Sequence, residues 1–527
     1  EGLTSFVGRQ QPLPEWADQG VILGLQGGAD KVLAVVRASQ QAEVPVTGVW
    51  LQDWMGKRHT ALGDRLWWNW ILDDHATLGS YAAWNTMREA LGPVRLLVYA
   101  NSFLADPEAA APPGTETVTA ARWRRSLFAE AVAEGYTIAA STASGVTDTA
   151  GAALAGTGTA AQQALESAAR GGGKAPHLLE SAGFKAALLD VTHPQAREWM
   201  IESVLRSELL SHAQASGWMA DFGEALPCEG IALHDGREAC NYHNQYPVDW
   251  AALNRDALRR AGKDKEAFFF SRSGFTTSPR VSPLFWLGDQ LPTWDERDGM
   301  ASALSGTLSS GLSGYALTHA DLGGYTGAHL ALPLPGLDYK LPLVSLVRSR
   351  ELLLRWQEMG AFAGAVYRSH EGLLPAAFHQ PWTDNATLAH LSRFARLFVA
   401  LRPYRRSLMT EAHQRGWPLA RHPVLHFPRD TALLADGDGG DGGGSDGGGG
   451  RVRQFMLGSD FMVLPVLAPG VATVRGYFPC GRWLHLWSGE GAAAEDEDAL
   501  DACAPPSLRG GGSDAAGTYV AAEGAGG

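Results

Sequence analysis

Eight short apolar runs of strand length, separated by stretches with helical spacing, constrain the fold of this chain more than any other feature. The runs cover residues 21–26, 47–54, 95–101, 217–222, 267–272, 284–289, 313–321 and 361–370. Continuous apolar runs of this kind are typical of strands buried on both faces, as in a parallel sheet. Residues 195–211 and 249–262, between two pairs of runs, have helical spacing and few breakers. The alternation predicts an α/β protein built on a (β/α)8 TIM barrel.

The length of 527 residues leaves room for a second domain beside such a barrel. We predict that the barrel occupies residues 1–417, with an insertion after its third strand at about residues 107–182. Short strand-like segments with turns follow, and they predict a C-terminal antiparallel β domain, sandwich-like, over residues 418–490. A Gly-rich insertion at 436–450 interrupts this domain, and the low-complexity tail at 491–527 is expected to be disordered.

Composition excludes several classes of partner. The chain has 43 Lys and Arg residues against 56 Asp and Glu residues, a formal net charge of −13, which argues against nonspecific binding to nucleic acid or anionic membranes. No charge-free apolar run is long enough to span a membrane. Four cysteines are too few for a disulfide scaffold in a chain of this length. The first residue is Glu1, so we expect a fragment or a processed product. No signal peptide is visible, which favours the cytoplasm without fixing the compartment or the oligomeric state.

Polar side chains end nearly every apolar run. They include Gln26, Gln52, Asp53, Asn101, Asp221, Arg272, Asp289, Asp321, Arg368 and His370. The carboxyl ends of the strands of a (β/α)8 barrel meet at one rim, and active sites lie there. We therefore expect these side chains to gather around a single pocket.

Two of these rim residues, Asp221 and Asp289, form a candidate pair of catalytic carboxyl groups. Glycoside hydrolysis needs one ionised carboxylate and one protonated carboxylic acid, so the two environments must push the pKa values apart. We expect the positive charge of Arg272 to hold Asp221 ionised, and aromatic surroundings to raise the pKa of Asp289.

Several strings in the chain resemble the family 31 glycoside hydrolases. WMADFGE, GDQ and DLGGY occur in this order, and QDW followed by GDRLWWNW resembles the sulfoquinovosidase subgroup of that family. The resemblance implies a retaining α-glycosidase that releases sulfoquinovose, a glucose with a sulfonate at C6, from α-sulfoquinovosides such as sulfoquinovosyl glycerol. It implies that Asp221 is the nucleophile and that Asp289 is the general acid/base.

The resemblance also implies a set of substrate-binding residues and no metal or cofactor. Arg65, Trp68 and Tyr325 match residues that bind the sulfonate. Gln26 and Gln52 match polar groups around the sugar hydroxyls, and Arg272 and His370 match positions near the nucleophile and the hydroxyl network. Asp53, Glu224 and Asp321 are expected to orient these groups. The family normally carries a β-sandwich before the barrel, which is not found in this sequence.

Two alternatives remain open at this point. A relative in the same family could act on neutral α-glucosides or α-xylosides, and a noncatalytic relative could bind carbohydrate without cleaving it. The expected partner in each case is a small-molecule glycoside, sulfonated in the preferred interpretation. The sequence does not identify the natural aglycone.

Overall fold

The computed structural model describes residues 1–60, 63–74, 81–106, 125–141, 174–181, 184–333, 340–430, 433, 453–486, 499–501 and 518–520. Eight parallel strands form its central sheet, in the order β14-β13-β12-β10-β5-β2-β1-β17. They are β1 (Val21–Leu25), β2 (Val46–Leu51), β5 (Arg95–Asn101), β10 (Gly217–Asp221), β12 (Phe268–Ser271), β13 (Leu284–Trp286), β14 (Thr318–His319) and β17 (Tyr367–Arg368). A parallel bridge between Leu322 and Ser369 joins the two outer strands. The predicted (β/α)8 barrel is therefore confirmed.

Strand lengths differ from the prediction at the last strand. The run at 361–370 was expected to be a strand throughout, but Ala361 and Ala363 belong to the end of helix α12 (Arg350–Ala363), and β17 contains only Tyr367 and Arg368. A short apolar run reads the same whether it is a buried helix end or a buried strand, so periodicity alone could not place this boundary.

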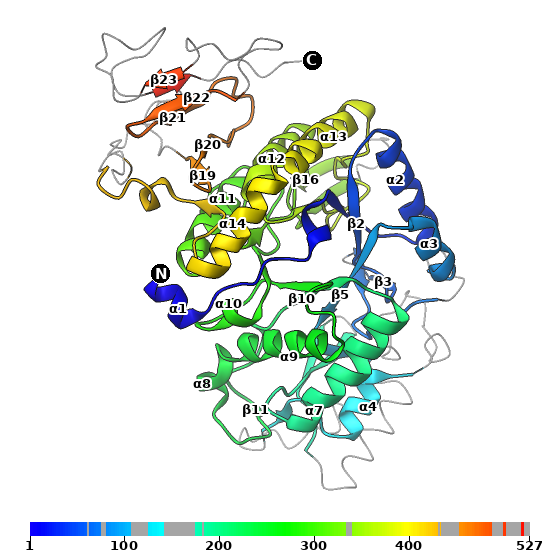
Figure 1. Cartoon of the computed structure of the whole chain (residues 1–527). Helices are drawn as coiled ribbons and strands as arrows, with labels where there is room; N and C mark the ends of the chain where they lie inside the picture. Colours follow the sequence, from blue (N-terminus) through cyan, green and yellow to red (C-terminus); the bar gives the residue numbers. More distant parts are fainter. Residues whose placement is uncertain are drawn as a thin grey trace.

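Helices surround the barrel and pack on the outside of the strands, as Figure 1 shows. The longer ones are α2 (Ala29–Gln41), α3 (Trp84–Leu91), α7 (Pro194–Trp199) continued by the π-type turns of η4 (Met200–His212), α9 (Tyr246–Arg260), α11 (Met300–Leu312), α12, α13 (Asn385–Ala400) and α14 (Arg402–Arg415). The shorter ones are α1 (Gly2–Val7), η1 (Glu15–Asp18), α4 (Leu127–Ala133), α8 (Ala239–His243), α10 (Ser278–Val281) and η5 (Pro423–Leu425).

Small antiparallel sheets extend from the barrel rim. The hairpin β3 (Lys57–Thr60) and β4 (Gly63–Leu66) follows β2, and β15 (Ala328–Pro333) pairs with β16 (Lys340–Leu346) after β14. Within and beside the predicted insertion lie the sheet of β6 (Phe103–Ala105), β9 (Phe184–Leu188) and β8 (Leu178–Ser181), and the pair β7 (Ala139–Ala140) and β11 (Ile231–Ala232). Much of the insertion lies outside the described residues.

The C-terminal region is antiparallel, as predicted. It contains β18 (Ala420–Arg421), β19 (Phe455–Leu457), β20 (Phe461–Val463), β21 (Arg475–Tyr477), β22 (Arg482–Leu484), β23 (Ala499–Asp501) and β24 (Thr518–Val520). The Gly-rich insertion at 436–450 lies outside the described residues. In the predicted tail, β23 pairs with β22 and β24 pairs with β21, and the rest is not described. The boundaries at 417 and 490 stay predictions.

One buried core fills the barrel and the layer between its strands and helices. All five residues of β1 and of β10 are buried, which explains why their sequences are continuous apolar runs instead of alternating ones. Gly24 of β1 lies so close to the last strand that a Cβ atom there would approach the backbone oxygen of Ser369 to 2.4 Å. Glycine at this position therefore permits the barrel to close.

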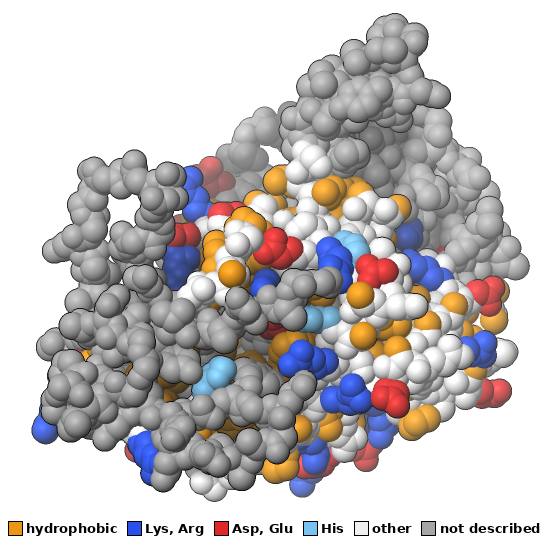
Figure 2. Space-filling model, turned by 90° about the horizontal axis from the view of Figure 1, so that it is seen from above, with side chains coloured by type: hydrophobic (Ala, Val, Ile, Leu, Met, Phe, Trp, Pro, Cys, Tyr) orange, Lys and Arg blue, Asp and Glu red, His pale blue; other side chains and the backbone are white. Residues whose placement is uncertain are grey.

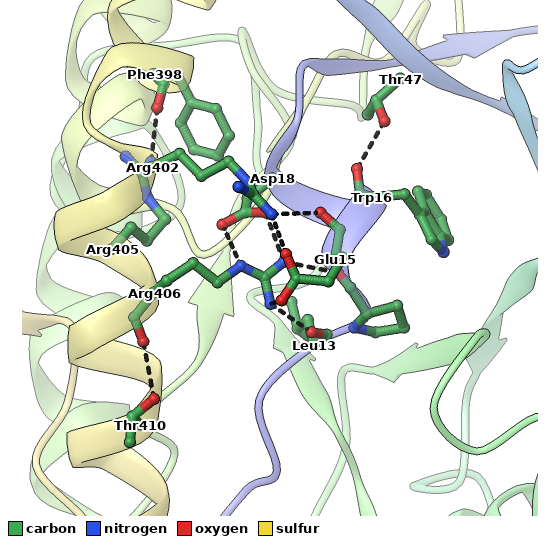
Figure 3. A network of polar contacts seen from close by, with 11 residues as sticks. Leu13, Glu15, Trp16, Asp18, Thr47, Phe398, Arg402, Arg405, Arg406 and Thr410 are labelled. Atoms are coloured by element: carbon green, nitrogen blue, oxygen red, sulfur yellow. Dashed lines mark hydrogen bonds and ion pairs between the residues drawn. The ribbon is translucent and has the colours of Figure 1, made fainter.

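The N-terminal segment is fastened to the last barrel helix by a buried ionic cluster (Figure 3). The carboxylate of Asp18, fully buried at the end of η1, pairs with Arg402 Nε at 3.1 Å and Arg406 Nη2 at 2.5 Å, both on α14. Glu15 also pairs with Arg402. This cluster holds the start of β1 against the last helix of the barrel.

The outer surface carries both signs of charge. On the face shown in Figure 2, blue basic and red acidic side chains lie interspersed among the described residues. No helix in the described part of the chain is both long and apolar enough to cross a membrane.

Candidate active site

Asp221 is the last residue of β10, and its carboxylate accepts two hydrogen bonds and pairs with one cation. The Tyr99 hydroxyl donates to Oδ2 at 2.7 Å, the Phe222 backbone N–H donates to Oδ1 at 2.8 Å, and Arg272 Nε lies 3.1 Å from Oδ1. Burial raises the pKa of Asp221, while Arg272 and the Tyr99 hydrogen bond lower it. The net direction is upward, so Arg272 opposes the cost of desolvating this carboxylate without outweighing it.

Arg272, which directly follows β12, connects three carboxyl groups. Besides Asp221, it contacts Asp289 Oδ2 through Nη1 at 3.1 Å and Glu224 Oε1 through Nη2 at 2.8 Å. Its guanidinium also lies over the Phe222 ring, 4.6 Å from the centroid. One cation therefore fixes the relative placement of the two candidate catalytic carboxyl groups, and Glu224 orients that cation by accepting from its Nε and Nη2.

Asp289 lies three residues beyond β13 and is partly exposed. Burial of the group and the nearby charge of Asp221 raise its pKa to about 7, against the opposing effect of Arg272. The Thr326 hydroxyl donates to the Asp289 backbone oxygen at 3.0 Å, which ties this loop to the loop after β14. A carboxyl group with this pKa exists in both protonation states near neutral pH, as an acid/base group must.

Gln52, Tyr325 and His370 lie together at the rim, in the loops after β2, β14 and β17. Gln52 Nε2 donates to the Tyr325 hydroxyl at 3.3 Å, and the Tyr325 and His370 rings have centroids 4.6 Å apart. Burial and the charges of Arg368 and Arg348 hold the pKa of His370 well below its usual value. Its Nδ1 accepts the Gly372 N–H at 2.8 Å, so the neutral ring carries its proton on Nε2.

Gln26, the residue after β1, is nearly buried and its amide is oriented by protein contacts. Its Nε2 donates to the Gly372 oxygen at 3.0 Å, and its Oε1 lies 3.4 Å from Lys57 Nζ. Its backbone N–H donates to Glu371 Oε2 at 3.1 Å, and Glu371 in turn pairs with Lys31 at 2.6 Å. The amide orientation of Gln26 is thus set before any ligand arrives.

Trp68 lies near the candidate nucleophile. Its ring stacks on Phe103 with centroids 5.4 Å apart and meets the edge of Phe222, the residue after Asp221, at 5.3 Å. The backbone of Arg65 belongs to β4 and pairs with Arg58 of β3. The side chain of Arg65 lies outside the described residues, so its expected contact with a sulfonate stays a prediction.

A buried ionic group lies beneath the rim. Arg368 pairs with Asp321 and donates through Nε to His319 Nε2 at 3.0 Å. Burial raises the pKa of Asp321 to about 6, although Arg368 lowers it. Asp53, also expected to orient other groups, accepts the Tyr81 hydroxyl at 2.6 Å and the Gly27 N–H at 2.8 Å. Asp53 therefore contacts the loop after β1, whereas Asp321 pairs with a residue of strand β17.

Tyr99 and Lys57 are contact residues of the site that were not predicted from the sequence. Tyr99 stands two residues before the polar end of β5, and alternate residues of a strand share a face, so its position relative to Asn101 carried the signal. Asn101 Nδ2 donates to the Tyr99 hydroxyl at 3.1 Å, completing a chain of hydrogen bonds that ends at Asp221. Lys57 is the first residue of the short strand β3, whose sequence has no periodic apolar pattern, and nothing local marked it.

A pocket of about 440 Å³ opens beside Arg272 and the loop that carries Asp289. It is lined by Glu224, His243, Asn244, Pro247, Arg272, Ser273, Gly274, Phe285 and Gly288.

A disulfide between Cys228 and Cys240, which no sequence pattern indicated, closes the loop between β10 and α8 that leads to His243. In the described part of the chain, no group of three or more His, Cys, Asp or Glu side chains is placed to hold a metal ion.

Comparison with known proteins identifies the class. Residues 13–408 match the model of the glycosyl hydrolases family 31 TIM-barrel domain, and residues 416–511 match that of the family 31 C-terminal domain. The chain therefore belongs to glycoside hydrolase family 31.

Two similar relatives are named sulfoquinovosidase. The one from Escherichia coli (strain K12) is 32% identical over 493 residues, covering 93% of this chain and 60% of that protein. The one from Agrobacterium fabrum is 33% identical over 489 residues, covering 93% of this chain and 61% of that protein. A solved structure of a family 31 sulfoquinovosidase from E. rectale, in complex with an aza-sugar inhibitor, has a TM-score of 0.75 at 27% identity, covering 99% of this chain and 62% of that one. The chain thus spans about three fifths of the length of these relatives.

Proposed function

We propose that this chain is a retaining α-glycosidase that releases sulfoquinovose from α-sulfoquinovosides, such as sulfoquinovosyl glycerol, by double displacement. The observation that carries the proposal is the arrangement of Asp221 and Asp289 around Arg272. Two hydrogen bonds and the Arg272 ion pair lower the pKa of Asp221 against the larger effect of burial, whereas burial and the charge of Asp221 raise the pKa of Asp289 to about 7. Two carboxyl groups with such different environments are what glycoside hydrolysis requires.

In the first step of the proposed reaction, an oxygen of Asp221 attacks the anomeric carbon while Asp289 gives its proton to the departing aglycone oxygen. The glycosidic bond breaks and an ester between the sugar and Asp221 forms. In the second step Asp289, now ionised, takes a proton from water as the water oxygen attacks the anomeric carbon. Asp221 leaves as a carboxylate, and the configuration at the anomeric carbon is retained.

Arg272 supports both half-reactions in this proposal. Its charge favours the ionised form of Asp221 before attack and again when the ester breaks. It also stabilises the ionised Asp289 that exists between the two steps, because Nη1 already lies 3.1 Å from Oδ2. Glu224, which shares the guanidinium, acts as its positioning residue.

The proposal of a sulfonated substrate is supported by the named relatives and by residues that match the sulfonate-binding positions of the family. Both relatives that cover 93% of this chain are named sulfoquinovosidase. A sulfonate keeps its negative charge at physiological pH, so its site needs a cation and aimed donors, and an arginine suits an oxyanion with two parallel hydrogen bonds. We assign these roles to Arg65, with Trp68 and Tyr325 adding an indole N–H and a hydroxyl. Gln26, Gln52 and His370 would receive the ring hydroxyls.

The first experiment compares the hydrolysis of an aryl α-sulfoquinovoside with that of the matching aryl α-glucoside. We expect a large preference for the sulfonated substrate. Arg65→Ala should lower kcat/KM for this substrate by roughly 30-fold or more, the cost of unpairing a desolvated charge, and should leave the glucoside rate nearly unchanged. Arg396→Ala, which removes an exposed cation paired with Glu43, is the matched control. Equal wild-type rates on both substrates would favour a neutral α-glucosidase.

A second experiment separates a catalyst from a carbohydrate-binding relative. An activated fluorosugar that stalls the second step should add the mass of one sugar to the peptide that contains Asp221, and Asp221→Asn should abolish the labelling. A folded protein that binds the sugar without becoming labelled would contradict the enzymatic proposal.

A further inference from the structure

The Arg348 side chain is a buried cation that no part of the proposed reaction uses. It is 2% exposed and lies two residues before helix α12, next to the N-cap Ser349. Its Nε donates to the His379 oxygen at 2.8 Å and its Nη2 donates to Gln380 Oε1 at 2.8 Å. Its Nη1 donates to the His370 oxygen at 2.8 Å, and longer contacts reach the backbone oxygens of Leu322, Gly324 and Glu371. All of these acceptors are neutral oxygens.

The acceptors belong to the two loops that meet where the barrel closes. Leu322 and Gly324 follow β14, and His370 and Glu371 follow β17, on either side of the bridge between Leu322 and Ser369. These outer strands have two residues each, so their own ladder is short. Arg348 therefore links the two loops across the junction more extensively than the strands themselves do.

The loops joined in this way carry candidate substrate-binding residues. Tyr325 directly follows Gly324, and His370 is itself an acceptor of Arg348 through its backbone. The Tyr325 and His370 rings are in contact, and Gln52 donates to the Tyr325 hydroxyl. A shift of either loop would change both the ring contact and that hydrogen bond.

Local features fit Arg348 to this place. Gly323 has a φ of +90°, and a Cβ atom on it would lie 2.4 Å from Arg348 Cδ, so only glycine permits the approach. The guanidinium lies 5.1 Å from the centroid of the Phe378 ring. Burial lowers the pKa of Arg348 to about 9, so the group stays charged at neutral pH. A lysine cannot replace it, because a single ammonium lacks the planar fork of five donors that reaches both loops.

We propose that Arg348 is a positioning residue that holds Tyr325 and His370 in register with Gln52, and so sets the preference of the site for a sulfonated sugar. This inference rests on the proposed function, since Tyr325 is its assigned sulfonate contact. Asp221, Asp289 and Arg272 contact none of the acceptors of Arg348, so the inference concerns substrate choice and not the chemical steps.

The test compares Arg348→Lys and Arg348→Gly with the wild type on the aryl α-sulfoquinovoside and the aryl α-glucoside. We expect the ratio of the two kcat/KM values to fall roughly 10- to 100-fold, the effect of losing hydrogen bonds to a charged group, mainly through KM for the sulfonated substrate. Guanidinium ion at millimolar concentration should restore much of this ratio in Arg348→Gly, and ammonium ion should not. Arg355→Lys, whose side chain pairs with Glu358 on α12, should keep the wild-type ratio.

A purely structural role predicts a different result. Partial unfolding lowers the active fraction, which reduces both rates equally and leaves the ratio unchanged, and an unchanged ratio would overturn the proposal. If Arg348→Gly is too unstable for kinetics, the affinity of Arg348→Lys for sulfoquinovose and for glucose, measured by calorimetry, gives the same comparison. A wild type that does not distinguish the two substrates would instead contradict the proposed function.

Discussion

The Tyr99 hydroxyl donates a hydrogen bond to Asp221 Oδ2 at 2.7 Å, from the strand next to the one that ends in the aspartate. Because Asn101 Nδ2 donates to the same hydroxyl oxygen, that oxygen acts as acceptor from Asn101 and its proton is directed at Asp221. Burial strongly raises the pKa of Tyr99, so the group stays a donor at every pH at which the enzyme would work. The candidate nucleophile therefore receives a fixed hydrogen bond besides the contact from Arg272.

Tyr99→Phe should lower kcat/KM by roughly 10- to 100-fold, since a hydrogen bond to an ionised group contributes about 1.5–3 kcal/mol. The pKa of Asp221 should rise further when this donor is lost, so the acidic limb of the pH profile should move to higher pH. Tyr246→Phe removes another buried tyrosine hydroxyl, which donates to the Leu189 oxygen, and should leave the acidic limb in place. A Tyr99→Phe profile that coincides with the wild-type profile would contradict this role.

The rate should fall as pH rises through about 7. In the proposed reaction the first step consumes the proton of Asp289, and its pKa of about 7 means that the acid form is lost above that value. The measurement is kcat/KM against pH for two glycosides, one with an alkyl aglycone and one with an activated aryl aglycone. The aryl substrate needs little protonation of its leaving group, so its alkaline limb should be weaker. Identical limbs for both substrates would point to a different titrating group.

Asp289→Asn should reduce turnover of the alkyl glycoside by roughly 10²- to 10⁴-fold, the usual contribution of a general acid. The same variant should be more stable than the wild type at high pH. The raised pKa means that the folded state holds this proton more tightly than the unfolded chain, so the resulting stability is complete below pH 3.8 and is lost as pH rises through about 7. Asparagine does not titrate, so the difference in Tm between variant and wild type should grow from pH 4 to pH 8. A constant difference would argue against the raised pKa.

Asp18→Ala should destabilise the protein by about 3–5 kcal/mol, because it leaves two arginines without their buried partner. Arg402 and Arg406 both contact this fully buried carboxylate. The free energy of unfolding in guanidinium chloride is the measurement. Glu43→Ala breaks the exposed pair with Arg396 and should cost no more than about 1 kcal/mol. Similar losses for the two variants would show that the buried cluster is not special.

Replacing both Cys228 and Cys240 with serine should cost about 3 kcal/mol, the chain-entropy value for a loop of this size. The loop runs from the end of β10 toward His243, so KM for substrates with large aglycones should rise while kcat for a small activated glycoside stays near the wild-type value. Treating the wild type with a reductant should reproduce the KM change, and the double variant should not respond further in KM.

The sequence predicts those parts of the candidate site whose polar side chains end or follow a strand. Asp221, Arg272 and Asp289 each end or follow a continuous apolar run, and parallel strands bring such ends to one rim. The contacts between them could not be predicted, because they join side chains from three strand ends: Asp221 and Glu224 at β10, Arg272 after β12 and Asp289 after β13. The pKa of Asp221 shows the same limit, since desolvation depends on what covers the group.

Long-range partners left no local signal in the sequence. Arg348 precedes an ordinary amphipathic helix. Nothing nearby in the chain indicates that it donates to backbone oxygens in the loops after two distant strands. The last strand was misplaced for a related reason: the residues at 361–363 are equally apolar in a helix end and in a strand, and only the packing against β14 decides between them.

The cluster around Asp18 has a consequence for how the chain is made. Asp18 is synthesised 384 residues before Arg402, so its carboxylate must wait through most of translation for this arginine. At about 5–20 residues per second this wait lasts roughly 20–80 seconds. Nascent chains stopped before α14 should therefore leave the first strand loosely held and accessible to chaperones or proteases, and release of the final barrel helix becomes the event that completes the domain.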